Sequence, residues 1–207
     1  MDSRRVEALA DGIFAIAMTL LVLELHVPAL PASASSRDLM IGLWSSWPKF
    51  AAYGGSFLIL GVLWIGHHNQ FHYIRRADRW FLWINICFLM CVSFMPYCTA
   101  LLGSFIWNRA AAAIYGVALL VTGAVLYGQW IYAVRNGLVV HDAPPEIVEA
   151  TGNRILFGLV GYVIALGFLL VSPLIGLALY VLIPLLYLRR GGIDRHLAAE
   201  HRRDRPE

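Results

Sequence analysis

Long apolar runs constrain this chain more than any other feature of its sequence. A helix needs about 20 mostly apolar residues to cross a bilayer, and six stretches approach or exceed that length: roughly 6–26, 48–68, 80–102, 110–133, 155–172 and 173–189. Of the 207 residues, 59% are hydrophobic and only 14% are charged, so the chain could not cover itself with polar surface in water. The sequence therefore predicts an all-α integral membrane protein with six transmembrane helices.

The segments between these stretches carry turn-forming or charged residues, as loops do. Only the pair Ser172 and Pro173 separates the last two stretches, so we expect those helices to form a tight hairpin. Residues 36–47 contain two tryptophans, which suits a short helix at the membrane interface. We expect a single six-helix domain over residues 1–190 and a basic tail over residues 191–207.

Arginine and lysine are distributed unequally between the two sides of the predicted bundle. With a cytoplasmic N-terminus, the opposite side holds only Arg37, Lys49 and Arg109, and the other 13 of the 16 basic residues lie in the cytoplasm. Short loops rich in these residues stay on the cytoplasmic side of a membrane. Both termini, including the tail, are therefore predicted to be cytoplasmic.

The first stretch, "RRVEALADGIFAIAMTLLVLEL", holds two carboxylates and a hydroxyl, which are costly groups in lipid. In a helix, residues three and four apart share a face. One narrow stripe of this helix then carries Gly12, Ile16, Thr19, Leu23 and His26. Asp11 and Glu24 lie off the stripe, near opposite ends, which predicts different roles for the carboxylates and the hydroxyl.

Each of these polar residues has more than one interpretation. Asp11 is expected to pair with Arg5 or with a Trp, Asn or His of a neighbouring helix, and Gly12 indicates close backbone packing beside it. Glu24 suits interface depth, where a carboxylate reaches water or pairs with Arg. Thr19 either donates to the carbonyl four residues earlier, the commonest outcome for a Thr inside a span, or supplies the one polar group of an apolar pore.

A histidine cluster, "WIGHHNQFHYIRRADRW", follows the second stretch. His68 and His72 are one helical turn apart, a possible but weak metal-ligand spacing that lacks a clear third ligand. A hydrogen-bonding cluster is the preferred interpretation, in which His67 or His68 reaches Asp11 at the same membrane depth. Because His titrates near neutral pH, a role in proton sensing stays open.

Residues of the later stretches indicate how the helices pack. Asn85 must find a partner across a helix interface, and Pro96 should kink its helix. Small residues that allow close backbone approach form two stripes: Ala113, Gly116 and Gly123, then Gly158, Gly161 and Ala165. The sequence shows no P-loop, hydrolase elbow, dinucleotide-binding pattern, nucleic-acid module or internal repeat, so we expect no enzyme, no cofactor and no nucleic-acid partner.

The first stretch also matches a known motif. Arg5, Asp11 and Gly12, followed by "FAIAMTLLVLEL", fit a pattern of the type Arg-x-x-x-Phe-Ser-Asp-Gly that runs into an apolar helix. The match departs at Leu9 and Ala10, which stand at the Phe and Ser positions. Without the Ser hydroxyl, the hydrogen bonds near the Asp must differ from those of the motif.

Two further patterns extend the match over at least the first hundred residues. The second stretch contains a "SF…W…HH" pattern at Ser56, Phe57, Trp64, His67 and His68, and the third an "N…P" pattern at Asn85 and Pro96. With these motifs, the chain resembles bacterial members of the transmembrane protein 175 family of endosomal and lysosomal potassium channels.

The resemblance implies a homotetramer in the bacterial inner membrane, with four first helices around a central pore. It also implies a cation channel without a re-entrant carbonyl filter, and the sequence has no Thr-Val-Gly-Tyr-Gly-like loop. By position, the apolar constriction falls on Ile16, Leu20 and Leu23, and the polar pore layer on Thr19. Glu24 would stand at the outer mouth. The cytoplasmic-side network would comprise Arg5, Asp11, Gly12, Trp64, His67 and His68.

Potassium would then be the permeant ion, with other monovalent cations as further candidates, and membrane lipids would surround the tetramer. Three alternatives remain at the level of sequence. One is a proton channel that uses His67 or His68 as a relay. The others are a membrane-embedded metalloenzyme based on His68 and His72, and a scaffold that conducts no ions.

Overall fold

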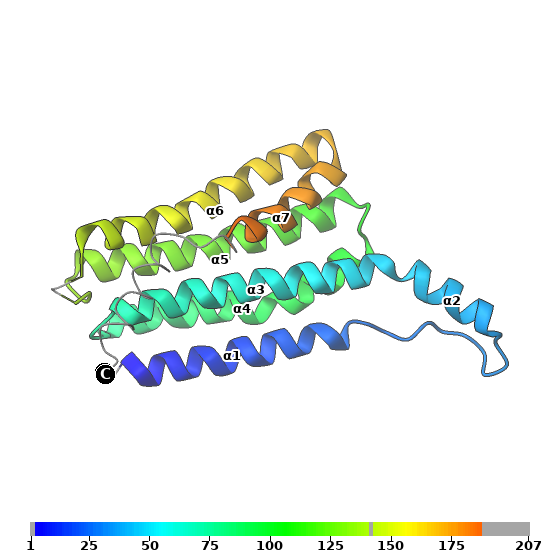
Figure 1. Cartoon of the computed structure of the whole chain (residues 1–207), viewed down its shortest axis with the longest axis horizontal. Helices are drawn as coiled ribbons and strands as arrows, with labels where there is room; N and C mark the ends of the chain where they lie inside the picture. The colour runs from blue at the N-terminus through cyan, green and yellow to red at the C-terminus, as the bar shows by residue number, and fades with distance from the viewer. Residues whose placement is uncertain (1–2, 141–142, 188–207) are drawn as a thin grey trace, which may run out of the picture.

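The computed structural model describes residues 3–140 and 143–187, which are helical apart from short connections (Figure 1). Along the chain the helices are α1 (Ser3–Leu23), α2 (Ser36–Ser45), α3 (Trp47–Tyr73), α4 (Arg79–Ser104), α5 (Arg109–Arg135), α6 (Pro145–Val171) and α7 (Pro173–Tyr187). Five of these, α1 and α3 to α6, are long and apolar enough to cross a membrane. The prediction of an all-α membrane protein is confirmed for this part of the chain.

The last predicted span corresponds to α7, which is apolar but has only 15 residues. A helix of that length is about 22 Å long, shorter than a hydrocarbon core of about 30 Å. Residues 188–189 of the predicted span and the tail over 191–207 lie outside the described residues. α6 ends at Val171 and α7 begins at Pro173, with only Ser172 between them, so the predicted helical hairpin is confirmed.

The start of the fifth predicted span, 155–172, is wrong, because α6 already begins at Pro145. The sequence "DAPPE" suggests a loop, but proline is favoured in the first turn of a helix, where its missing N–H needs no partner. Glu146 in the same turn interacts favourably with the positive end of the helix dipole. The two prolines therefore start a helix rather than interrupt one.

The short helix expected at residues 36–47 is present as α2, which extends beyond the helical bundle (Figure 1). Ser35 caps it through a capping box, because the Asp38 N–H donates to the Ser35 hydroxyl while the Ser35 N–H donates to the Asp38 carboxylate. The hydrogen bonds from the Ser35 hydroxyl and backbone lower the pKa of Asp38. This local box defines where α2 begins.

Close helix contacts occur where the small-residue stripes predict them. A Cβ at Gly116 of α5 would overlap the Tyr180 hydroxyl of α7, and one at Gly161 of α6 would approach Ile183 of α7 to 3.0 Å. Gly123 of α5 similarly faces α6. These glycines therefore let α5, α6 and α7 pack together as one layer of the bundle.

α1 packs along α3 and α4 (Figure 1). Its buried residues recur every three or four positions, as one face of a helix requires, and they are Val6, Ala10, Phe14, Ala17 and Leu21. Two of these are alanines, which bring the helix axes close together. Because a single face of α1 is used in this packing, its opposite face is left outside the protomer's core.

Candidate functional site

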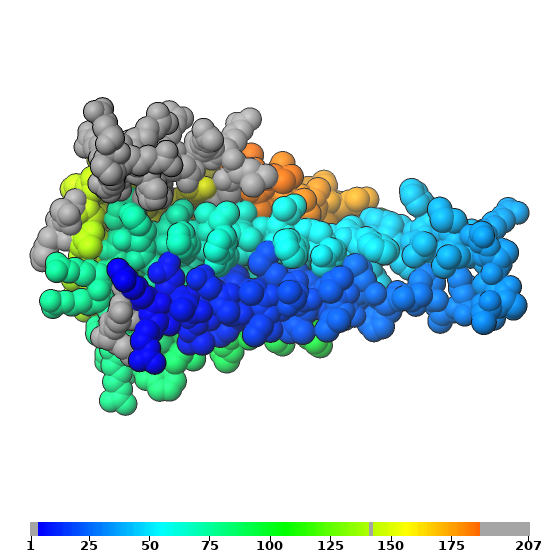
Figure 2. All heavy atoms as spheres, turned by 60° about the horizontal axis from the view of Figure 1, so that its bottom comes forward, coloured from blue at the N-terminus to red at the C-terminus, as the bar shows by residue number. Residues whose placement is uncertain are grey.

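The exposed face of α1 carries the residues that the sequence places in a pore. Ile16 is 60% exposed and Leu23 is 67% exposed, whereas Leu21 on the opposite face is fully buried. Thr19 and Leu20 are exposed between them. Figure 2 shows α1 uncovered along one side of the molecule. The expected stripe is thus a mainly apolar strip that is largely exposed in the part of the chain that the structure describes.

Thr19 uses its hydroxyl proton inside α1. The hydroxyl donates to the carbonyl oxygen of Ile16 at 2.8 Å, so the expected bond to the carbonyl four residues earlier is wrong by one residue. A hydroxyl has two acceptor lone pairs besides its proton. With the proton engaged in the helix, the Thr19 oxygen can present those lone pairs to a cation beside the exposed face.

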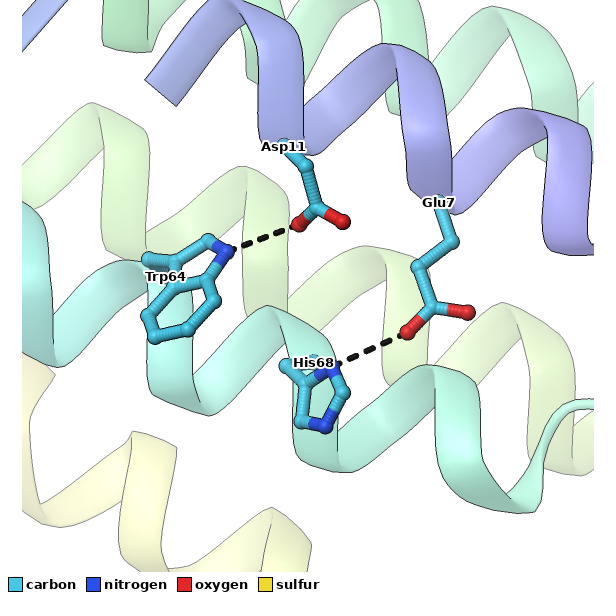
Figure 3. Close-up of polar contacts among 4 residues, drawn as sticks. All are labelled: Glu7, Asp11, Trp64 and His68. Atoms are coloured by element: carbon cyan, nitrogen blue, oxygen red, sulfur yellow. Dashed lines mark hydrogen bonds and ion pairs between the residues drawn. The ribbon is translucent and has the colours of Figure 1, made fainter. Parts of the chain in front are cut away.

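Two polar contacts join the first half of α1 to α3 (Figure 3). The Trp64 indole N–H donates to Asp11 Oδ1 at 2.8 Å, and His68 Nδ1 lies 2.9 Å from Glu7 Oε1. Each helix contributes residues four positions apart, so the contacts stack one turn above the other. The Trp64 and His68 rings also stack, with centroids 5.9 Å apart. We call these four residues the α1–α3 ladder.

The ladder corrects the expected partner of Asp11. Neither His67 nor His68 is its hydrogen-bond partner; the Trp option is the one realised, through Trp64. Glu7 was not among the predicted site residues. Its position four residues before Asp11, matching the four residues between Trp64 and His68, was the available signal.

His67 is buried and faces α4 rather than the residues of the ladder. Its Nε2 is 2.9 Å from the Asn85 side-chain oxygen on α4, so the prediction that Asn85 has a partner across a helix interface is confirmed. The ring stacks on Phe71 and Phe88, with centroids 4.4 and 5.2 Å away. These contacts make His67 part of the packing between α3 and α4.

Two other predicted residues, Gly12 and Arg5, have fewer contacts than expected, and a third, Pro96, lies inside a continuous helix. Gly12 is exposed, and a Cβ there would meet nothing within 4 Å, so close packing at this glycine does not occur within the protomer. Arg5 is exposed and forms no ion pair with any described residue. Pro96 is buried inside α4, which continues through it from Arg79 to Ser104.

The two residues at which the chain departs from the family motif, Leu9 and Ala10, differ in how deeply they are buried. Ala10 is fully buried against the core, while Leu9 is half exposed. A Ser hydroxyl at position 10 would therefore point into the protomer. Its replacement by Ala removes a buried polar group there, and the Asp11 carboxylate is held by Trp64 instead.

Glu24 lies just beyond the last residue of α1, so the span predicted to reach residue 26 ends earlier. The chain turns there, and the Glu24 carbonyl accepts a hydrogen bond from the His26 backbone. The Glu24 side chain borders a cavity of about 110 Å³ together with His26 and Lys49. Glu24 therefore lies just beyond the end of the exposed strip rather than within it.

A buried hydroxyl chain links three helices and was not predicted. Thr99 of α4 donates to the Ser56 hydroxyl of α3, and that hydroxyl lies 2.8 Å from the Tyr115 hydroxyl of α5. All three side chains are buried. Hydrogen bonds of this kind hold helices together in lipid, and Ser56 of the "SF…W…HH" pattern is at the centre of this chain.

The described residues contain no group of three or more His, Cys, Asp or Glu side chains that could hold a metal ion. His68, one half of the weak His68 and His72 spacing, is instead directed at Glu7. Two imidazoles one turn apart leave an incomplete ligand set. The geometry of the described chain thus gives the metalloenzyme interpretation no site.

Comparison with known proteins places this geometry in one family. Residues 5–96 match the family described as endosomal/lysosomal potassium channel TMEM175. A potassium channel of Streptomyces collinus is 36% identical over 90% of this chain and 91% of its own length. A crystal structure of a lysosomal potassium-selective channel TMEM175 homolog from Chamaesiphon minutus superposes with a TM-score of 0.80, at 31% identity, over 90% of this chain and 96% of that one.

The vertebrate relatives match a smaller part. The human endosomal/lysosomal proton channel TMEM175 is 35% identical over 46% of this chain, which covers only 20% of the human protein. The similarity to the bacterial relatives, by contrast, runs through nearly the whole of both chains. All of these relatives are ion channels rather than enzymes. The chain therefore belongs to the TMEM175 family of potassium channels.

Proposed function

We propose that four copies of this chain form a potassium-permeable channel whose pore is lined by the exposed face of α1. The observation that carries the proposal is the strip of Ile16, Thr19 and Leu23, which is exposed among the residues that the structure describes. Rotational symmetry would bring the same strip of each copy to a common axis. The names of the bacterial relatives, which are potassium channels, support the choice of ion.

Ile16 forms the narrowest ring in this proposal, and Leu20 and Leu23 extend the apolar wall. Four branched side chains that meet on an axis exclude water, and an ion cannot pass a dry constriction. A small rotation or outward movement of the four α1 helices widens the ring and admits water. Thr19 supplies the one polar layer, through oxygen lone pairs that face the ion.

The two carboxylates act near the ends of the pore. Glu24 stands at the outer mouth, where its charge raises the local concentration of cations. Asp11 belongs to the cytoplasmic-side network with Trp64, and Arg5, Gly12, His67 and His68 complete that region. In this proposal Asp11 mainly fixes the position of α1 against α3, because one carboxylate oxygen is already engaged.

The proposed topology follows from the charge distribution. Six helices, with α7 as the short sixth, cross the bacterial inner membrane, and both chain ends and the tail over 191–207 are cytoplasmic. The strongly apolar outer surface of α3 to α7 is covered by lipid. A short α7 is compatible with crossing, because a bilayer thins locally around a short helix at modest cost.

The decisive experiment is potassium flux through purified protein in liposomes. Substitution Ile16→Asn should raise basal flux by about tenfold and lower the preference for potassium over sodium, because a polar ring keeps the constriction wet. Ile114→Asn is the matched control, since Ile114 is also about half exposed but lies on α5. Equal flux in the wild type and Ile16→Asn would contradict the gate, and absent potassium flux in both would contradict the channel.

The four-fold arrangement can be tested separately. A Leu23→Cys variant, with the exposed Cys87 replaced by Ser, should form disulfides between copies under mild oxidation, because four Leu23 positions converge on the axis. Leu170→Cys on α6 is equally exposed but should remain monomeric on the same gel. Cross-linking at position 170 and not at position 23 would place a different face at the interface.

Proton conduction is the second candidate, favoured by the name of the vertebrate relatives. His67 is poorly placed as a relay, since its ring is buried between aromatic rings and paired with Asn85. His68 is more exposed and lies in the α1–α3 ladder. Acidification of potassium-free liposomes tests this candidate: proton flux abolished by His68→Ala supports a relay, and flux unaffected by that change rules one out at this residue.

A further inference from the structure

A cavity with a mixed polar and apolar lining, which we call the Lys49 cavity, lies at the end of the bundle where α1 ends and α5 begins. It has a volume of about 590 Å³ and lies between the start of α3 and the connection from α4 to α5. Its polar lining comprises Ser45, Ser46, Lys49, Ser104 and Asn108. Lys49 is the only lysine of the chain and forms no ion pair with any residue that the structure describes. The cavity thus offers one positive charge and several hydrogen-bonding groups.

An apolar cavity of about 220 Å³ adjoins it, between α3 and α7. Its walls include Ala51, Ile59, Leu102, Leu177, Ala178 and Val181. Ile106 and Trp107 line both cavities, so the connection from α4 to α5 forms their common border. The Trp107 ring meets Trp47 edge-on at 6.2 Å, at the rim of the apolar cavity.

The two cavities together have the polarity profile of a membrane lipid. We propose that they bind one anionic phospholipid, with its phosphate beside the Lys49 ammonium group in the Lys49 cavity and one acyl chain between α3 and α7. The assignment goes beyond the proposed pore, because none of its lining residues belongs to the exposed strip of α1. It does not depend on which ion the channel conducts.

Three observations favour a lipid over other occupants. Tryptophans prefer the headgroup level of a membrane, so Trp47 and Trp107 place the border of the cavities at the depth where headgroup meets acyl chain. An apolar cavity leaves its lining without dispersion contacts, and a neighbouring acyl chain restores them. Lys49 and Glu24 line a common cavity of about 110 Å³ but form no ion pair, so the Lys49 ammonium group is available to an anionic headgroup.

The test uses full-length protein in phosphatidylcholine liposomes that contain a phosphatidylglycerol with a photoactivatable acyl chain. Cross-linked peptides, identified by mass spectrometry, should concentrate on 51–59 and 174–181, and unlabelled phosphatidylglycerol should compete. Lys49→Ala should reduce this labelling about fivefold, the effect of one basic side chain on an anionic lipid. Arg37→Ala removes a basic residue of α2 outside the cavities and should leave it unchanged.

A second variant tests the acyl-chain site without touching the charge. Ala178→Phe should fill the apolar cavity and abolish labelling at 51–59, whereas Ala124→Phe, at an exposed position of α5, should not. Both variants should elute from a sizing column like the wild type. Uniform labelling of all lipid-facing helices, or labelling that survives both Lys49→Ala and Ala178→Phe, overturns the proposal. So does protein–protein cross-linking through an Ala178→Cys variant, because a second copy would then occupy the cavity.

Discussion

The two faces of α1 are built from different kinds of side chain. The face against α3 and α4 has Ala10 and Ala17 on either side of Phe14, with Val6 and Leu21 towards its ends. The opposite face presents larger branched residues, such as Ile16 and Leu23, which remain mostly exposed. This difference indicates that α1 packs closely against neighbouring helices on one side only.

The difference shows which interactions are completed inside the protomer. Small residues at the buried face allow close backbone approach, which drives helix packing in membranes. The exposed face makes few such contacts with the described residues, as the proposed pore requires. The α1–α3 ladder runs along the boundary between the faces and fixes how α1 is rotated about its own axis.

The buried face should carry the largest effect on stability. Phe14→Ala removes a fully buried ring that contacts Phe88 and should lower the free energy of unfolding by about 3–5 kcal/mol. Unfolding by SDS in mixed micelles measures this change. Phe57→Ala on the half-exposed side of α3 is the control and should cost far less. Equal losses for the two variants would remove the distinction between packed and unpacked faces.

The Asp11–Trp64 hydrogen bond of the α1–α3 ladder should have the next largest effect. A double-mutant cycle of Asp11→Asn and Trp64→Phe should give a coupling free energy of about 1–2 kcal/mol, because the bond has a charged acceptor but lies at an exposed site. The same pair of changes should alter basal potassium flux, since rotation of α1 moves the pore residues. A coupling near zero would mean that Trp64 does not orient the pore helix.

The Glu7–His68 contact of the ladder should contribute less to the free energy of unfolding. The Glu7 and His68 side chains are 27% and 54% exposed, their contact is an ion pair only when His68 is protonated, and exposed ion pairs contribute about 0.2–1 kcal/mol. A double-mutant cycle of Glu7→Gln and His68→Gln should therefore give a smaller coupling free energy than the cycle of Asp11 and Trp64. This coupling free energy should fall further in high salt. If the coupling exceeded that of Asp11 and Trp64, our ranking of the two contacts would be reversed.

The sequence predicted the features that depend on periodicity. The apolar runs and the exposed stripe of α1 follow from spacing alone, as does the hairpin at Ser172 and Pro173. The start of α6 was missed because Pro145 is equally compatible with a loop and with a first helical turn. Local sequence does not distinguish these two; burial of the following residues decides between them.

Pairing across helices was predicted less well. The sequence gives depth in the membrane but not the rotation of one helix relative to another, so Trp64, His67 and His68 were all plausible partners for Asp11. The packing of Phe14 against Phe88 turns α1 such that Asp11 faces Trp64, while His67 points to Asn85. These helix rotations depend on how side chains from different helices pack in the core, which the sequence of a single helix does not specify.

The exposed face should show the smallest effect on stability of the protomer. Leu23→Ala should change the free energy of unfolding of detergent-solubilised monomer by less than about 0.5 kcal/mol, because Leu23 makes few contacts there. Potassium flux through the assembled channel should nevertheless increase, since shortening four side chains widens the apolar pore. Leu170→Ala, exposed on α6, should leave both quantities unchanged. If Leu23→Ala behaves like Leu170→Ala, both residues face lipid, and the contrast between the two faces of α1 would then reflect packing against lipid rather than a pore.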